Sequence, residues 1–140
     1  MSQPVSAREE SIQILAEALR LQVAGFDCLE KSQQQLMQGD LSGGVLTLSG
    51  YMDESGQFAP KFAGWPVEQP VLLGLGNVFV RVYLLRASTL IEWCKQDRSL
   101  CDQLLPIVRS DLQVMLGWPD QWFEDDVRPL FQDLKSRFRL

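Results

Sequence analysis

The most apolar stretch of this 140-residue chain runs from Val71 to Leu85, and it constrains the fold more than any other segment. Three alternating valines in it are typical of a β-strand. No turn signal interrupts the second half of the stretch, however, and good helix formers follow. We therefore predict a helix over 70–96, broken near Gly74 and Gly76, with a strand over 78–85 as the alternative. Because the segment is apolar almost all round, it must lie at the centre of the fold.

A long helix is also predicted over residues 7–38. Ser6 and Glu9 have the spacing of a capping box, and Gly39 is suited to the left-handed position that ends a helix. Large apolar residues recur every three or four positions and are expected to form one core stripe: Ile12, Leu15, Leu19, Phe26, Leu29 and Leu36. A second row seven residues apart widens this stripe: Ile14, Leu21 and Cys28. Two apolar edges imply neighbours on two sides.

Residues 39–70 have a different composition, rich in glycine and proline. These residues are expected to exclude a continuous helix. We predict a small β-hairpin or an irregular insertion at about residues 40–69. It carries four exposed aromatic candidates: Tyr51, Phe58, Phe62 and Trp65.

The C-terminal third is predicted to be helical. One helix should cover about 105–116, kinked or shortened by Pro106, and a last one about 129–138, starting at Pro129. The expected architecture is thus an all-α bundle of four or five helices, forming a single helical domain over residues 1–140.

The chain contains no histidine, which removes the usual general base and the commonest metal ligand. Its net charge of −5 argues against a nucleic-acid surface, which needs clustered lysine and arginine. The acidic run Trp122–Asp126 lacks the spacing of a calcium loop, and its charge suits the first turn of a helix. Gly74 and Gly76 are not followed by the third glycine of a dinucleotide-binding fingerprint, since Phe79 occupies that position. We therefore expect no metal, no cofactor and no catalytic residues.

The three cysteines, Cys28, Cys94 and Cys101, are odd in number and form no CxxC motif. We expect buried thiols rather than disulfides, and hence a reducing cytoplasm. The first ten residues lack the basic and apolar regions of a signal peptide. The longest apolar run falls short of the ~20 residues that span a bilayer, so no membrane partner is expected.

These observations favour a non-enzymatic protein–protein interaction module: an accessory subunit, assembly chaperone, adaptor or antagonist. Its partner would be another protein, and self-association is left open. The expected contacts are the apolar helix surface and the aromatic side chains Tyr51, Phe58, Phe62, Trp65 and Trp122. The first alternative is a helical domain that binds a small hydrophobic ligand between Phe26, Phe79, Tyr83 and Trp93. The second is an enzyme that uses carboxylates such as Asp53 and Glu54, or Tyr51.

Overall fold

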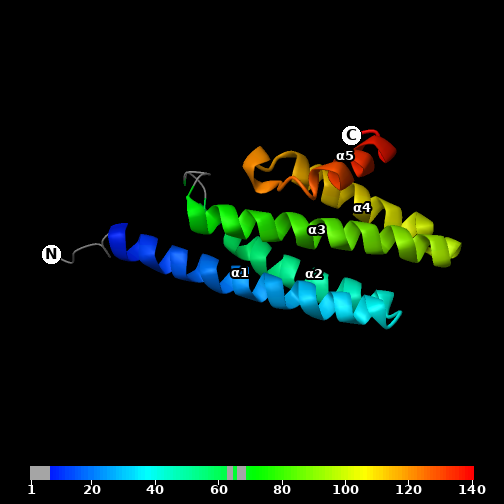
Figure 1. Ribbon diagram of the computed structural model, residues 1–140, viewed down its shortest axis with the longest axis horizontal. Coiled ribbons are helices and arrows are strands. Elements are labelled where there is room, and N and C mark those ends of the chain that lie inside the picture. Colours follow the sequence, from blue (N-terminus) through cyan, green and yellow to red (C-terminus); the bar gives the residue numbers. More distant parts are fainter. Residues whose placement is uncertain (1–6, 63–64, 66–68) are drawn as a thin grey trace.

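The structure, a computed structural model, describes residues 7–62, 65 and 69–140 (Figure 1). Within these residues the chain is all-α, as predicted, and it forms no strand. Three short 3-10 turns, η1 (Ala59–Phe62), η2 (Arg98–Leu100) and η3 (Asp120–Trp122), lie between the α-helices. The α-helices are α1 (Ala7–Met37), α2 (Leu41–Phe58), α3 (Pro70–Gln96), α4 (Cys101–Leu116) and α5 (Arg128–Arg137).

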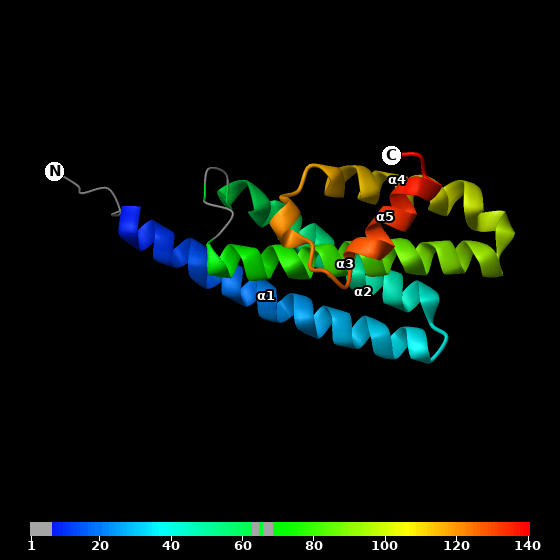
Figure 2. The same cartoon turned by 45° about the horizontal axis from the view of Figure 1, so that its top comes forward.

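Helix α3 is the central element of the bundle. The antiparallel pair α1 and α2 packs against one side of it, and α4 packs against the other side (Figure 1). Figure 2 shows α5 crossing α3 obliquely on the α4 side. This arrangement buries α3 from several directions and leaves one long face of α1 without a covering helix.

The prediction of a helix over residues 70–96 is confirmed, and the strand alternative is wrong. The side chain of Gln69 caps the helix by accepting hydrogen bonds from two backbone amides, and Pro70 occupies the first turn. The expected break at the early glycines is absent. A Cβ at Gly76 would lie 2.3 Å from the indole of Trp122, so this glycine makes room for a neighbouring ring within an unbroken helix.

Helix α3 is also long and apolar enough to cross a membrane by length and composition. Half of that apolar segment is buried against the other helices. A central core helix meets the same criteria, so this finding carries little weight on its own.

The hairpin or insertion expected at residues 40–69 is wrong, because most of this segment forms α2. Gly39 does adopt the left-handed conformation, with a φ of 80°, and Asp40 caps α2 by accepting a hydrogen bond from the Gly43 amide at 2.9 Å. Each helical glycine costs up to about 1 kcal/mol. Burying Leu48, Tyr51 and Met52 gains about 1.5–3 kcal/mol for each large apolar side chain, which outweighs that cost.

The limits of α1 are close to the predicted ones, but only half of its expected core stripe is confirmed: Leu15, Leu29 and Leu36 are partly buried, and the other three members are exposed. Ile12 and Phe26 are more than half exposed, and Leu19 is half exposed. The row that faces α2 and α3 consists mainly of small residues: Ala18, Leu21, Gly25, Cys28 and Ser32. At Gly25 a Cβ would lie 2.2 Å from Val78, so the small row permits a close approach of the helices that large side chains would prevent.

Cys94 and Cys101 form a disulfide, contrary to the prediction of unpaired thiols. The reversal of the chain through η2 brings their Cα atoms to 4.8 Å, within the range that a disulfide requires. The pairing removes the argument from unpaired cysteines that favoured a reducing cytoplasm. The thiol of Cys28 is buried and donates to the Thr47 carbonyl at 3.5 Å.

Candidate functional site

The α1 stripe is a continuous row of exposed apolar side chains on the outer face of the first helix. Its members are Ile12, Ala16, Leu19, Val23 and Phe26. The four larger side chains are 57%, 50%, 61% and 53% exposed, in chain order. Single exposed apolar residues are normal on protein surfaces, but an aligned row of this length indicates a contact face.

The spacing within the α1 stripe is four, three, four and three residues, which is the pattern of an interhelical seam. At 1.5 Å per residue the stripe extends roughly 21 Å along the helix. Such a seam places each side chain in a hole formed by the side chains of a facing helix. The geometry therefore suits a helical partner better than an extended strand or a loop.

A shallow groove continues the α1 stripe toward α3 and α5. Phe26 is followed one turn later by Leu29, which lies at the edge of the groove, so the two form neighbouring steps of one surface. Leu130, 41% exposed, lies on the opposite edge. The groove has a volume of about 200 Å³ and is lined by Leu29, Gln33, Arg81, Leu84, Leu85, Ser88, Val127 and Leu130.

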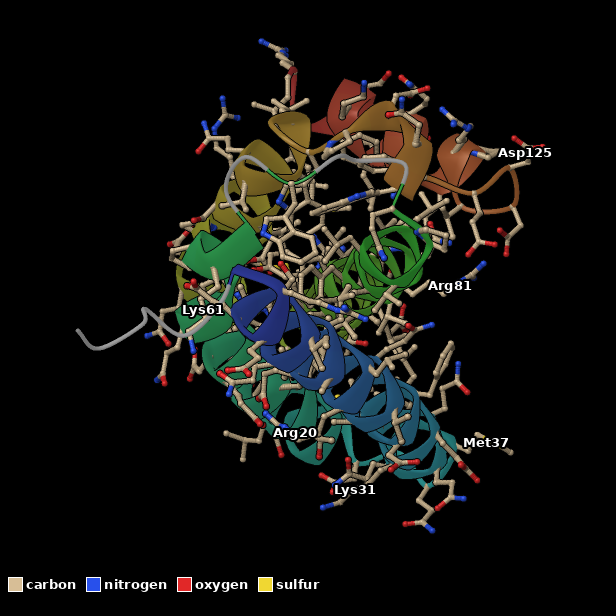
Figure 3. All side chains as sticks on the ribbon, turned by 90° about the vertical axis from the view of Figure 1, so that its left-hand side faces the viewer. Arg20, Lys31, Met37, Lys61, Arg81 and Asp125 are labelled. Atoms are coloured by element: carbon tan, nitrogen blue, oxygen red, sulfur yellow. A yellow bond between two sulfur atoms is a disulfide. The ribbon has the colours of Figure 1, made fainter. Side chains whose placement is uncertain are left out.

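The orientation of α1 agrees with this continuity. Met37, 88% exposed, extends the three–four spacing of the α1 stripe toward the end of the helix. In Figure 3 Met37 and Arg81 lie on the same side of the molecule, whereas Arg20 and Lys31 lie at the lower edge. The α1 stripe and the groove thus form one surface, which we call the α1–α3 face.

The border of the α1–α3 face is acidic. Arg81 donates hydrogen bonds to Glu124 at 3.1 Å and to Asp126 at 2.9 Å, and the hydrogen bond from Arg81 holds the pKa of Asp126 below its ordinary value. This arginine is therefore matched by two carboxylates. Among the described residues no cation pairs with the exposed carboxylates of Asp27, which lies beside the stripe, and Glu30, which takes the next position of the row after Phe26.

On the same border of the stripe as Asp27, and seven residues earlier on α1, Arg20 is similarly matched. It pairs with Glu17 one turn earlier and reaches Glu54 of α2 at 2.9 Å. The hydrogen bond from Arg20 lowers the pKa of Glu17. Two of the arginines near the face are thus engaged by pairs of acids, which leaves the local charge negative.

Of the five aromatic residues predicted to bind a partner, the three whose side chains are described do not form an exposed surface. Tyr51 lies in the core on α2, 5% exposed, and its hydroxyl donates to the Leu21 carbonyl at 2.7 Å. Burial raises the pKa of the Tyr51 phenol. Phe58 and Phe62 end α2 and η1, and their side chains lie outside the described residues. Trp65 and Trp122 are partly buried against the core.

Trp122 belongs to an aromatic cluster that joins α3 to the segment after α4. Its ring centroid lies 5.5 Å from that of Trp118 and 6.0 Å from that of Phe79, and Tyr83 lies 4.6 Å from Trp118. A pocket of about 240 Å³ opens beside these rings, lined also by Ser55, Gly56 and Val114. The sequence-predicted ligand pocket is only partly assembled, because Phe26 belongs to the exposed α1 stripe and Trp93 packs against a group of core residues, including Leu90 and Leu104, that does not contain Phe79.

Ionisable groups in the interior form a structural contact. Arg86 of α3 donates to both carboxylate oxygens of Asp111 on α4, at 2.8 and 2.6 Å. It also donates to the Ser49 hydroxyl of α2 at 3.0 Å. The pair therefore ties three helices together, and its charges are fully engaged. Among the described residues, no three acidic, cysteine or histidine side chains gather in a way that could hold a metal ion.

No family model matches the chain, and neither curated proteins nor solved structures show significant similarity to it. The function must therefore be argued from the α1–α3 face itself. Sequence reasoning found every apolar residue of the α1 stripe except Ala16 and Val23, but assigned the row to the core. The sequence signal that distinguishes the two faces is the set of small residues at Ala18, Gly25 and Ser32, which permits closer packing than large side chains do.

Proposed function

We propose that this chain is a non-enzymatic protein-interaction module that binds a helix of another protein on its α1–α3 face. Such a module would act as an accessory subunit, an assembly chaperone, an adaptor or an antagonist. The observation that carries the proposal is the α1 stripe, an exposed row of apolar residues with the spacing of a helix–helix seam.

The energetics indicate how large the partner segment must be. Full burial of a large apolar side chain contributes about 1.5–3 kcal/mol, and the four large residues of the stripe are already about half buried. Completing their burial therefore gains roughly 3–6 kcal/mol. Association itself costs about 4–15 kcal/mol, so stable binding requires a helix that also covers the adjoining groove.

Photo-crosslinking in the cells that produce the protein tests this proposal. The photoreactive residue p-benzoylphenylalanine is placed at Phe26 in the α1 stripe. Leu46, 73% exposed on α2, supplies a matched control position outside the α1–α3 face. We expect an adduct with another polypeptide from position 26 and none from position 46.

A second variant links the adduct to the stripe. Leu19→Asp, introduced into the chain that carries the photoreactive residue at position 26, should remove the adduct while the protein remains folded. Equal adducts from positions 26 and 46, or an adduct that persists with Leu19→Asp, would contradict the proposal.

A further inference from the structure

We infer that the segment bound at this face is a basic amphipathic helix, an inference that rests on the proposed function. Its apolar residues would pack on the α1 stripe and the groove, and its lysines or arginines would face the acidic border. The inference specifies the chemistry of the partner, which the apolar stripe alone does not.

The α1 stripe and the groove form a continuous surface. The groove begins at Leu29, one turn beyond Phe26, and extends to Gln33 on α1. A helix that lies along α1 from Ile12 to Gln33 would span about 32 Å, the length of roughly 21 helical residues. On its far side it would contact Leu85 of α3 and Leu130 at the edge of the groove.

The border of the α1–α3 face carries an excess of negative charge. Residues 1–70 carry four basic and nine acidic side chains, so the half of the chain that contains α1 has an excess of acids. Asp27 is exposed beside the stripe, and Glu30 is exposed at the position that follows Phe26 in the row. Arg81 is the shared partner of two carboxylates, Glu124 and Asp126. Complementary charge around an apolar contact guides association and selects the partner.

A second copy of this chain is the alternative occupant of the α1–α3 face. A two-fold symmetric dimer through this face would bring the same surface of each copy together. Its acidic borders would then meet acidic borders, and like charges in contact oppose association. A basic helix meets the same apolar surface without this repulsion.

Two synthetic helical peptides of 21 residues provide the test. They share one apolar face with leucine at three–four spacing, and the flanking positions carry lysine in one peptide and glutamate in the other. Fluorescence anisotropy with the full chain measures both dissociation constants. We expect the lysine peptide to bind at least tenfold more tightly, and this preference to shrink as salt is raised from 50 to 500 mM.

Charge reversal on the protein supplies the matched control. The double variant Asp27→Lys/Glu30→Lys should abolish or invert the preference, because these exposed side chains do not contribute to the core. Leu19→Asp should weaken binding of the lysine peptide at least tenfold. Circular dichroism spectra of all variants should match that of the unchanged protein.

The outcomes separate the inference from the proposed function. Equal binding of both peptides, lost in Leu19→Asp, would overturn the charge inference and leave helix binding standing. Binding of the lysine peptide that is unaffected by Leu19→Asp would show charge attraction without docking, and would contradict both. Sedimentation as a dimer that Leu19→Asp converts to a monomer would identify a second copy as the occupant and overturn the inference.

Discussion

Two leucines of α1, two residues apart, should differ sharply in their contribution to stability. Leu21 is fully buried between α2 and α3, whereas Leu19 is 50% exposed. Leu→Ala at a buried site removes apolar contacts and leaves a cavity, at a cost of about 2–5 kcal/mol. Leu19→Ala leaves no cavity, and alanine is the best helix former, so we expect a loss below about 1 kcal/mol.

Urea denaturation followed by circular dichroism at 222 nm measures both values. A loss of about 3 kcal/mol in Leu21→Ala corresponds to a fall in Tm of roughly 10 °C for a chain of this size. The dependence of the unfolding free energy on urea should be equal in both variants, since the surface exposed on unfolding barely changes. A larger loss in Leu19→Ala than in Leu21→Ala would show that the row Ile12–Phe26 is the core, and would refute the packing of α1 described above.

Three further predictions concern the interior. Asp111→Asn should lower the free energy of unfolding by about 3 kcal/mol in urea denaturation, because Arg86 would remain as a largely buried charge without its carboxylate partner; a loss below about 1 kcal/mol would contradict the role of this pair. Replacing Cys94 and Cys101 by alanine should lower the free energy of unfolding by about 2–3 kcal/mol, the value expected for a disulfide between residues seven positions apart. Dithiothreitol should destabilise the unchanged protein by the same amount and leave the variant unaffected. Burial raises the pKa of Cys28 from its ordinary value of 9.0 to about 11, so stability should fall as pH rises from 9 toward 11, because the unfolded thiol ionises first. Cys28→Ala should reduce this fall, and a flat urea midpoint between pH 8 and 11 would argue against the buried thiol.

Much of the helical framework could be predicted from local signals. The bounds of α3 were predicted to the residue, because its apolar run is long and Pro70 and Asp97 mark its ends. Gly39 adopts the left-handed conformation that its position predicted. These features depend on residues close together in the chain, which is the information that a sequence pattern contains.

The errors arose where packing between helices, or a reversal of the chain, decides the structure. Helix α2 contains glycines that disfavour a helix locally, and it forms because Leu48 and Tyr51 are buried against α1 and α3. The disulfide depends on the turn between α3 and α4, which places Cys94 beside Cys101. Neither contact is visible in the spacing of neighbouring residues.

The α1 stripe could be predicted only in part, again because packing between helices decides which side chains are buried. Periodicity showed that α1 has two apolar rows, but not which of them faces the core. That choice depends on the fit of Gly25 and Ala18 against neighbouring helices, which is a property of the packed bundle. Tyr51 is expected on an exposed insertion but lies in the core, because its segment forms α2 and packs against α1 and α3.

Thiol labelling of a Val23→Cys variant tests the central claim most directly. In the native state the new thiol should react rapidly with Ellman's reagent, while the buried Cys28 in the same molecule stays unreactive and serves as an internal control. Addition of the lysine peptide should slow the reaction of position 23 at least tenfold. A thiol at position 23 that reacts only after unfolding, or one that reacts at the same rate with saturating peptide, would contradict the assignment of the α1 stripe as an exposed helix-binding surface.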